Sequence, residues 1–157
     1  MLKIYNQEIS QCIQELLEKD DWNFEFDEEK GVFRFSLTLD SKLNILHYYI
    51  TVRESDYISY GVLPIAANDH KTEMAEFLTR ANYGLNNGNF ELDYRDGEIR
   101  FKCYVNCDGV LPSDQIIRDS IFAPATIVDH YADGILSVLF DLKDPENAVM
   151  DCEKETD

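Results

Sequence analysis

The side chains of this sequence that could do chemistry are four cysteines, three histidines and many neighbouring carboxylates. Two of the cysteines, Cys103 and Cys107, lie close together in a CxxxC spacing. A cysteine becomes reactive when a nearby basic group lowers the pKa of its thiol. Cys103 alternates with polar residues in a strand-like pattern, which predicts a small core side chain. Cys107 is the better candidate for a reactive thiol, although no basic residue lies beside it in the sequence.

The histidines give no sign of a metal site. His47, His70 and His130 lie in different predicted elements, and none has Cys, His or carboxylate neighbours at the spacing of a known metal motif. The chain also lacks GxSxG, HExxH and glycine-rich phosphate-binding motifs. Adjacent carboxylates carry little information in so acidic a chain. The sequence therefore predicts no catalytic, cofactor or metal site, and we expect a protein that is not an enzyme.

Composition restricts the partners and the compartment. The 157 residues include 14 Lys plus Arg and 31 Asp plus Glu, for a formal net charge of −17. So negative a surface repels nucleic acids and anionic membranes, which we exclude as partners. We expect no signal peptide at the start of the chain and no membrane span, because no segment approaches the required run of about 20 apolar residues. These features favour a cytoplasmic protein with reduced cysteines.

Two periodicities organise the first half of the chain. Residues 6–19 have apolar side chains at helical spacing, with Asn6 as the predicted N-cap. From residue 22 the period changes to two, which predicts a meander of four strands buried on one face. We place the turns at residues 30–31, 41–42 and 54–56. The resulting cross-strand pairs are Phe26 with Phe35, Leu37 with Leu46, Phe35 with Tyr48, Phe33 with Ile50, Val52 with Ile58, and Ile50 with Tyr60.

The second half begins with a helix and a charged hairpin. Residues 70–85 carry an apolar helical stripe, which Gly84 or Gly88 would end. The Asp-Gly pair at residues 96–97 is a strong signal for a two-residue hairpin turn. This turn pairs Tyr94 with Ile99, Leu92 with Phe101, Phe90 with Cys103, Arg95 with Glu98, Asp93 with Arg100, and Glu91 with Lys102. The opposite charges are therefore accounted for by a structural role: they form cross-strand pairs that help to fix the register.

The remaining sequence predicts one more helix and a tail. The helix runs from the N-cap Ser113 to about Phe140, and Pro124 should kink or divide it near Ala123. Residues 143–157 are acidic and begin with a helix breaker, so we expect a mobile tail. No repeat or linker marks a second domain. We therefore expect one α+β domain over residues 1–142, with the helices on one face of an antiparallel sheet.

The order helix, strand meander, helix, hairpin, helix resembles the type III secretion chaperone-like fold. Within it, residues 77–102, FLTRANYGLNNGNFELDYRDGEIRFK, resemble the bacterial YbjN-like family, in which a helix ending near an asparagine, here Asn82, leads into a Gly-Asn-Phe-Glu-Leu hairpin. These matching residues are turn and core positions. The resemblance implies a small, dimeric, non-enzymatic bacterial protein with a chaperone-like or regulatory role, and it carries no catalytic residues.

One predicted surface is a candidate binding site. The outer face of the meander collects basic and aromatic side chains, of which we single out Arg34, His47, Tyr49 and Arg53, with Tyr57 placed alongside them. Tyr and Arg are common anchors of protein interfaces. The simpler interpretation is a solvated sheet face with ordinary cross-strand and cation–π pairs. Both interpretations remain open at this point.

Two functions from different classes fit these observations. The first is a homodimeric protein-binding module that holds another protein or a peptide segment. The second is a regulatory domain that senses a small ligand in an apolar pocket between the sheet and the helices. An enzyme would need polar side chains that converge in such a pocket, and the sequence indicates none.

Overall fold

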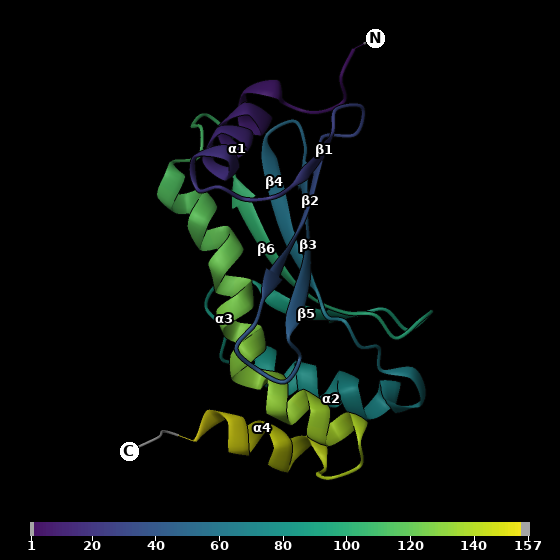
Figure 1. The fold of residues 1–157 in the computed structure, drawn as a ribbon. Helices are drawn as coiled ribbons and strands as arrows, with labels where there is room; N and C mark the ends of the chain where they lie inside the picture. Colours follow the sequence, from purple (N-terminus) through teal and green to yellow (C-terminus); the bar gives the residue numbers. More distant parts are fainter. Residues whose placement is uncertain (1, 155–157) are drawn as a thin grey trace.

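The computed structural model describes residues 2–154 as an α+β fold built on one six-stranded antiparallel sheet, with strand order β1-β2-β3-β4-β6-β5 (Figure 1). The elements in chain order are α1 (Gln7–Lys19), β1 (Glu25–Asp27), β2 (Val32–Thr38), β3 (Ile45–Val52), β4 (Asp56–Val62), the 3₁₀ turn η1 (Asn68–His70), α2 (Lys71–Asn82), β5 (Asn89–Leu92), β6 (Ile99–Asn106), α3 (Asp114–Leu139) and α4 (Pro145–Glu153).

The helices pack against the inner face of the sheet and leave the outer face uncovered. The long helix α3 runs beside the sheet, with α1 near its first turns and α2 and α4 near its end (Figure 1). Inner-face side chains of every strand after β1 are buried in the common core, among them Phe33, Tyr48 and Phe101. The expected α+β fold with helices on one side of the sheet is confirmed. Among residues 2–154, no helix is long and apolar enough to cross a membrane.

Local capping signals position the helices as expected. The side chain of Asn6 accepts hydrogen bonds from the backbone N–H groups of Glu8 and Ile9, and Ser113 accepts one from Ile116. Pro124 does not divide α3, which continues without interruption to Leu139. In this stretch the hydroxyl of Tyr48, from β3, donates to the carbonyl of Ile121, so the sheet is tied to the helix close to the proline.

Two hairpins have longer loops than expected. In each of them the pairing register of the two strands is shifted by two residues. In β1–β2, Phe26 pairs with Phe33 rather than Phe35, because the carboxylate of Asp27 holds a four-residue loop by accepting from two loop amides. In β5–β6, Phe90 pairs with Phe101 rather than Cys103, and the loop spans residues 94–97. A shift of two residues leaves every side chain on its expected face. The β2–β3 register is confirmed, with Phe33 opposite Ile50.

The β3–β4 register differs from the expected register by one residue, so each side chain of β4 lies on the opposite face of the sheet from the one expected. The loop is residues 54–55, because Arg53 and Asp56 pair through both their backbones and their side chains. Val52 therefore faces Tyr57, and Ile50 faces Ser59, instead of Ile58 and Tyr60. The inner face of β4 thus carries a serine and a glycine, Gly61, where a Cβ atom would lie only 2.7 Å from the side chain of Leu46. Small residues are needed there, so the apolar alternation of β4 indicates the wrong face.

The outer edge of β5 is capped by a side chain from the end of α2. The Asn82 amide donates to the carbonyl oxygen of Phe90 at 3.0 Å, and its oxygen accepts from the Phe90 N–H at 2.7 Å. Asn82 thus takes the place that a neighbouring strand would occupy. Edge strands with free backbone groups invite pairing with other chains, and this contact closes one such edge.

The expected mobile tail is wrong for the part of residues 143–157 that forms α4. Asp144 is the N-cap, Pro145 occupies the first turn, and Ala148 and Val149 are buried against α2 and α3. The helix is also held by a hydrogen bond of 2.7 Å from the hydroxyl of Tyr131 to the carboxylate of Glu153. An aspartate followed by proline is a helix start, not only a breaker. Residues 155–157 of the expected tail lie outside the described part of the chain.

Candidate functional site: the outer sheet face

The outer face of the sheet is organised into two rows of side chains that run across its strands. The register aligns Glu25, Arg34, Tyr49, Tyr60, Lys102 and Asn89 in one row, and Ser36, His47, Val62, Arg100 and Glu91 in the next. These rows contain three basic and two acidic side chains. In a chain with a formal charge of −17, the centre of this face is therefore slightly positive.

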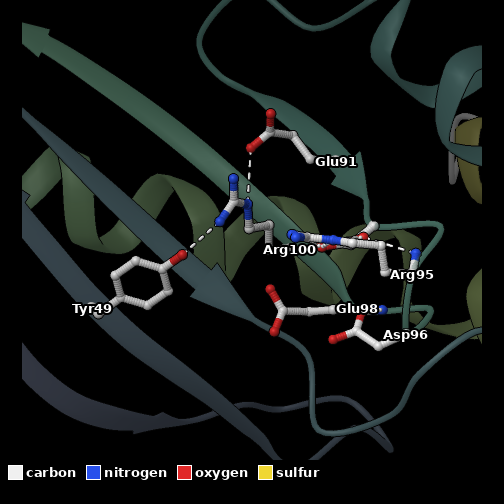
Figure 2. A network of polar contacts seen from close by, with 7 residues as sticks. Tyr49, Glu91, Arg95, Asp96, Glu98 and Arg100 are labelled. Atoms are coloured by element: carbon white, nitrogen blue, oxygen red, sulfur yellow. Dashed lines mark hydrogen bonds and ion pairs between the residues drawn. The ribbon is translucent and has the colours of Figure 1, made fainter.

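Arg100 is the centre of a polar network on this face (Figure 2). Its Nη1 donates to the Tyr49 hydroxyl at 2.6 Å, and its Nε donates to the Glu91 carboxylate at 2.9 Å. Its guanidinium carbon also lies 4.1 Å from the ring centroid of Tyr60. The rings of Tyr49 and Tyr60 stack with centroids 4.6 Å apart. Hydrogen bonds, cation–π attraction and stacking together hold these side chains in a fixed arrangement.

The electrostatics of the network favour the charged form of Arg100 and the neutral form of Tyr49. Desolvation acts to lower the pKa of Arg100, but Tyr49 and Glu91 outweigh it, so the pKa is raised. Burial raises the pKa of Tyr49 despite the nearby guanidinium. At the hairpin tip, the hydrogen bond from Arg95 lowers the pKa of Asp93 to about 2. None of these shifts produces a group that would exchange protons near pH 7, as a general acid or base requires.

A shallow hollow of about 690 Å³ lies beside this network, between β1 and the hairpin end of the face. Its lining residues are Asn23, Phe24, Glu25, Arg34, Phe35, Ser36, His47, Tyr48, Tyr49, Val62 and Glu98. The side chain of Ser36 lies 3.0 Å from Nδ1 of His47, which fixes the imidazole at the hollow. The hollow is open and mixed in polarity, which suits a polypeptide segment better than a small apolar ligand.

Arg34 differs from every other arginine of the chain. The other five each have a carboxylate within ion-pair distance: Arg53, Arg80, Arg95, Arg100 and Arg118. Arg34 is exposed at the hollow and has no such partner among residues 2–154. Glu25, which is opposite it in the register, is not within that distance. The guanidinium of Arg34 is therefore available to a carboxylate that this part of the chain does not supply.

The structure brings together three of the four residues singled out from the sequence. Arg34, His47 and Tyr49 all line the hollow. Arg53 lies outside it, at the β3–β4 loop, where it binds the carboxylate of Asp56 with distances of 2.5 and 2.8 Å. The placement of Tyr57 on the outer face is wrong: the side chain is fully buried on the inner face, and its hydroxyl lies 2.9 Å from that of Ser120 in α3.

Sequence reasoning missed Tyr60 and the role of Arg100. The expected β3–β4 register placed Tyr60 in the core, and Arg100 was assigned only to a pair with Asp93. The contact between Arg100 and Tyr60 depends on β6 lying beside β4, with α2 and β5 between them in the chain. The apolar alternation of β4 misleads, so its polar loop contact, Arg53 with Asp56, is the signal that gives the correct register.

The cysteines and histidines do not form a second site. The four cysteines are free, and burial raises the pKa of both Cys103 and Cys107, which opposes formation of a reactive thiolate. His70 lies 3.0 Å from the Asp141 carboxylate. In the sequence it is well separated from both His47 and His130. Within residues 2–154, no three His, Cys, Asp or Glu side chains gather as a metal site would require.

No protein-family model and no curated protein sequence matches this chain. The resemblance to the YbjN-like family therefore stays a prediction, and the functional reading that follows depends on the geometry of the outer face.

Proposed function

We propose that this chain is a non-catalytic binding module that holds a segment of another polypeptide on the outer face of its sheet. The observation that carries the proposal is the combination of an uncovered face, a hollow, and a Tyr–Arg array beside an arginine that forms no ion pair with the described part of the chain. Tyr and Arg provide large contact areas and directional hydrogen bonds, and they dominate the energetics of many interfaces.

The charge of this face also indicates the kind of segment. The protein as a whole is strongly acidic, which would favour basic partners at long range. The two rows, however, are slightly positive, and Arg34 has no carboxylate partner among the residues that the structure describes. At physiological ionic strength, charges separated by more than about 8 Å are largely screened, so local contacts decide specificity. We therefore propose a partner segment with at least one acidic side chain.

The proposal includes a homodimeric protein with a chaperone-like or regulatory role, which is what the resemblance implies, and a cytoplasmic location. The alternative, a domain that senses a small ligand between sheet and helices, receives less support. The hollow lies on the opposite face of the sheet, and the inner face is closely packed at Gly61 against Leu46.

A double variant at the hollow, Arg34→Ala/Tyr49→Ala, should weaken binding of peptide segments at least tenfold. The probes would be fluorescent peptides selected from a random dodecapeptide phage library on the wild-type protein, with affinities from fluorescence polarisation. Loss of the guanidinium and of the aromatic shelf removes two anchors, each worth more than 1 kcal/mol at a typical interface.

The matched control is Arg80→Ala/Tyr83→Ala, which removes an arginine and a tyrosine from α2 and the residue after it. This control should bind the selected peptides as the wild type does. Equal affinity in both double variants, or equal loss in both, would contradict the proposed site.

The homodimer predicts a solution mass of about twice 18.2 kDa by light scattering. The mass should be constant over a hundredfold dilution above the dissociation constant. A mass of one chain at every concentration would contradict the dimer, while the peptide-binding proposal would stand on its own measurement.

A further inference from the structure

Strand β2 has an open edge next to the hollow. Its neighbour β1 pairs with only three residues of β2, from Val32 to Arg34. The chain before β1 does not continue the ladder, and Figure 1 shows β1 alongside only the first part of β2. Beyond Arg34, β2 therefore has β3 on one side and, among residues 2–154, no strand on the other.

The phase of the β2–β3 ladder shows which backbone groups face the open side. Leu39 N–H donates to the Asn44 carbonyl at 2.7 Å, and Val52 N–H donates to the Gly31 carbonyl at 2.9 Å. Because hydrogen-bonded pairs alternate along an antiparallel ladder, the odd-numbered residues of β2 bond to β3. Ser36 and Thr38 then direct their N–H and C=O groups away from β3. On that side, no partner for these groups is found among residues 2–154.

Side chains on both faces of this edge are suited to a bound strand. On the outer face lie the hollow and Arg34, the one arginine that has no ion pair within residues 2–154. On the inner face, Trp22 packs against Phe35 and Phe122, and the Phe122 side chain is 45% exposed. Alternate residues of an added strand would therefore meet a positive, polar surface and an aromatic one.

We propose that the β2 edge at Ser36 and Thr38 accepts an extended segment of a partner polypeptide as an added strand. The segment places an acidic side chain at Arg34 and an apolar side chain, one position along, against Trp22 and Phe122. This inference rests on the proposed function and specifies how the segment binds: backbone hydrogen bonds supply affinity, and alternate side chains supply specificity.

The opposite edge of the sheet shows why β2 is the candidate. At β5, Asn82 occupies both backbone groups of Phe90, so that edge is closed by the chain's own side chain. No comparable side chain bonds to the main chain of Ser36 or Thr38 within the described residues. The fold protects one edge and leaves the other available beside a hollow.

Ser36→Pro tests the backbone contact. Proline removes the outward N–H but no β2–β3 hydrogen bond, and edge strands tolerate proline at such positions. The matched control is Ser36→Ala, which keeps the N–H and loses only the contact with His47. Peptides selected from the dodecapeptide library should bind Ser36→Pro at least about tenfold more weakly than Ser36→Ala, which measures what loss of the serine side chain alone does.

A second measurement uses the unchanged protein, so it does not depend on how the variants fold. Each selected peptide is resynthesised with one backbone nitrogen methylated at a time. Because only every second N–H of an added strand faces β2, the loss of affinity should alternate with a period of two. Circular dichroism and thermal unfolding would show whether Ser36→Pro keeps the fold. Thr38→Pro provides a second variant of the same edge.

Several results would overturn the inference. A methylation profile without alternation, or equal binding by Ser36→Pro and Ser36→Ala, would exclude strand addition; if Arg34→Ala/Tyr49→Ala still loses binding, the proposed function survives. Failure to select any peptide that distinguishes wild type from that double variant would contradict both. A wild-type dimer that Ser36→Pro converts to a monomer would assign the edge to a second copy of the chain instead.

Discussion

Replacing Asn82 with alanine should destabilise the protein by about 2 to 4 kcal/mol. The substitution leaves the N–H of Phe90 without its partner and removes one of the two donors to the Phe90 carbonyl. A buried backbone group that loses its partner costs about 1 to 3 kcal/mol, and the tie between α2 and β5 is lost as well. Urea denaturation followed by circular dichroism would give the free energy of unfolding.

Asn89→Ala is the matched control for this prediction. The Asn89 amide donates to the same Phe90 carbonyl at 3.1 Å, but it does not accept from the Phe90 N–H. Its removal should therefore cost less than about 1 kcal/mol. Asn82→Asp keeps the acceptor and loses the donor, so it should fall between the two alanine variants. Equal losses in Asn82→Ala and Asn89→Ala would show that the bond from the Phe90 N–H to Asn82 adds no stability of its own.

Deleting residues 143–157 should cost about 3 to 5 kcal/mol and lower the melting temperature by about 10 °C. The deletion removes α4, whose Ala148 and Val149 are buried, and exposes the surface of α2 and α3 beneath them. Full burial of one valine is worth about 1.5 to 3 kcal/mol. The hydroxyl of Tyr131 also loses its acceptor, Glu153.

A shorter deletion, of residues 155–157 alone, is the control and should leave the melting temperature unchanged. Differential scanning calorimetry would compare the three chains. If the longer deletion melted within 2 °C of the full chain, α4 would be an appendage that contributes no stability, as expected of the mobile tail that the sequence suggests.

Local signals in the sequence were sufficient to predict the helices α1, α2 and α3. Asn6 and Ser113 act as N-caps through hydrogen bonds to residues two or three positions away, so their role is visible in a short window. The missed helix α4 has only a short buried stripe, at Ala148 and Val149, and its Asp-Pro start was interpreted as a helix stop. Its stability comes from α2 and α3, which a local pattern does not include.

The registers show where the sequence is less informative. The pairing registers of two hairpins differ from the expected ones by two residues. The carboxylates of Asp27 and Asp93 accept hydrogen bonds from loop N–H groups, and these bonds stabilise longer loops than the glycines alone suggest. Those two shifts leave every side chain on its expected face of the sheet. The one-residue difference at β3–β4 did not, and it determines the site, because it places Tyr60 beside Tyr49 and under Arg100. Small inner-face residues, Ser59 and Gly61, are a requirement of packing that alternation does not reveal.

The strand order determines when the sheet can be completed while the chain is being synthesised. Strands β2, β3 and β4 join through short loops and can pair as soon as residues 32–62 exist. The place beside β4 stays empty until β6, residues 99–106, has been made, and α3 follows only from residue 114. Chains are made from the N-terminus at roughly 5 to 20 residues per second. For several seconds, therefore, the part of the apolar sheet face that α3 will cover stays exposed on the nascent chain, and such exposed surface favours aggregation.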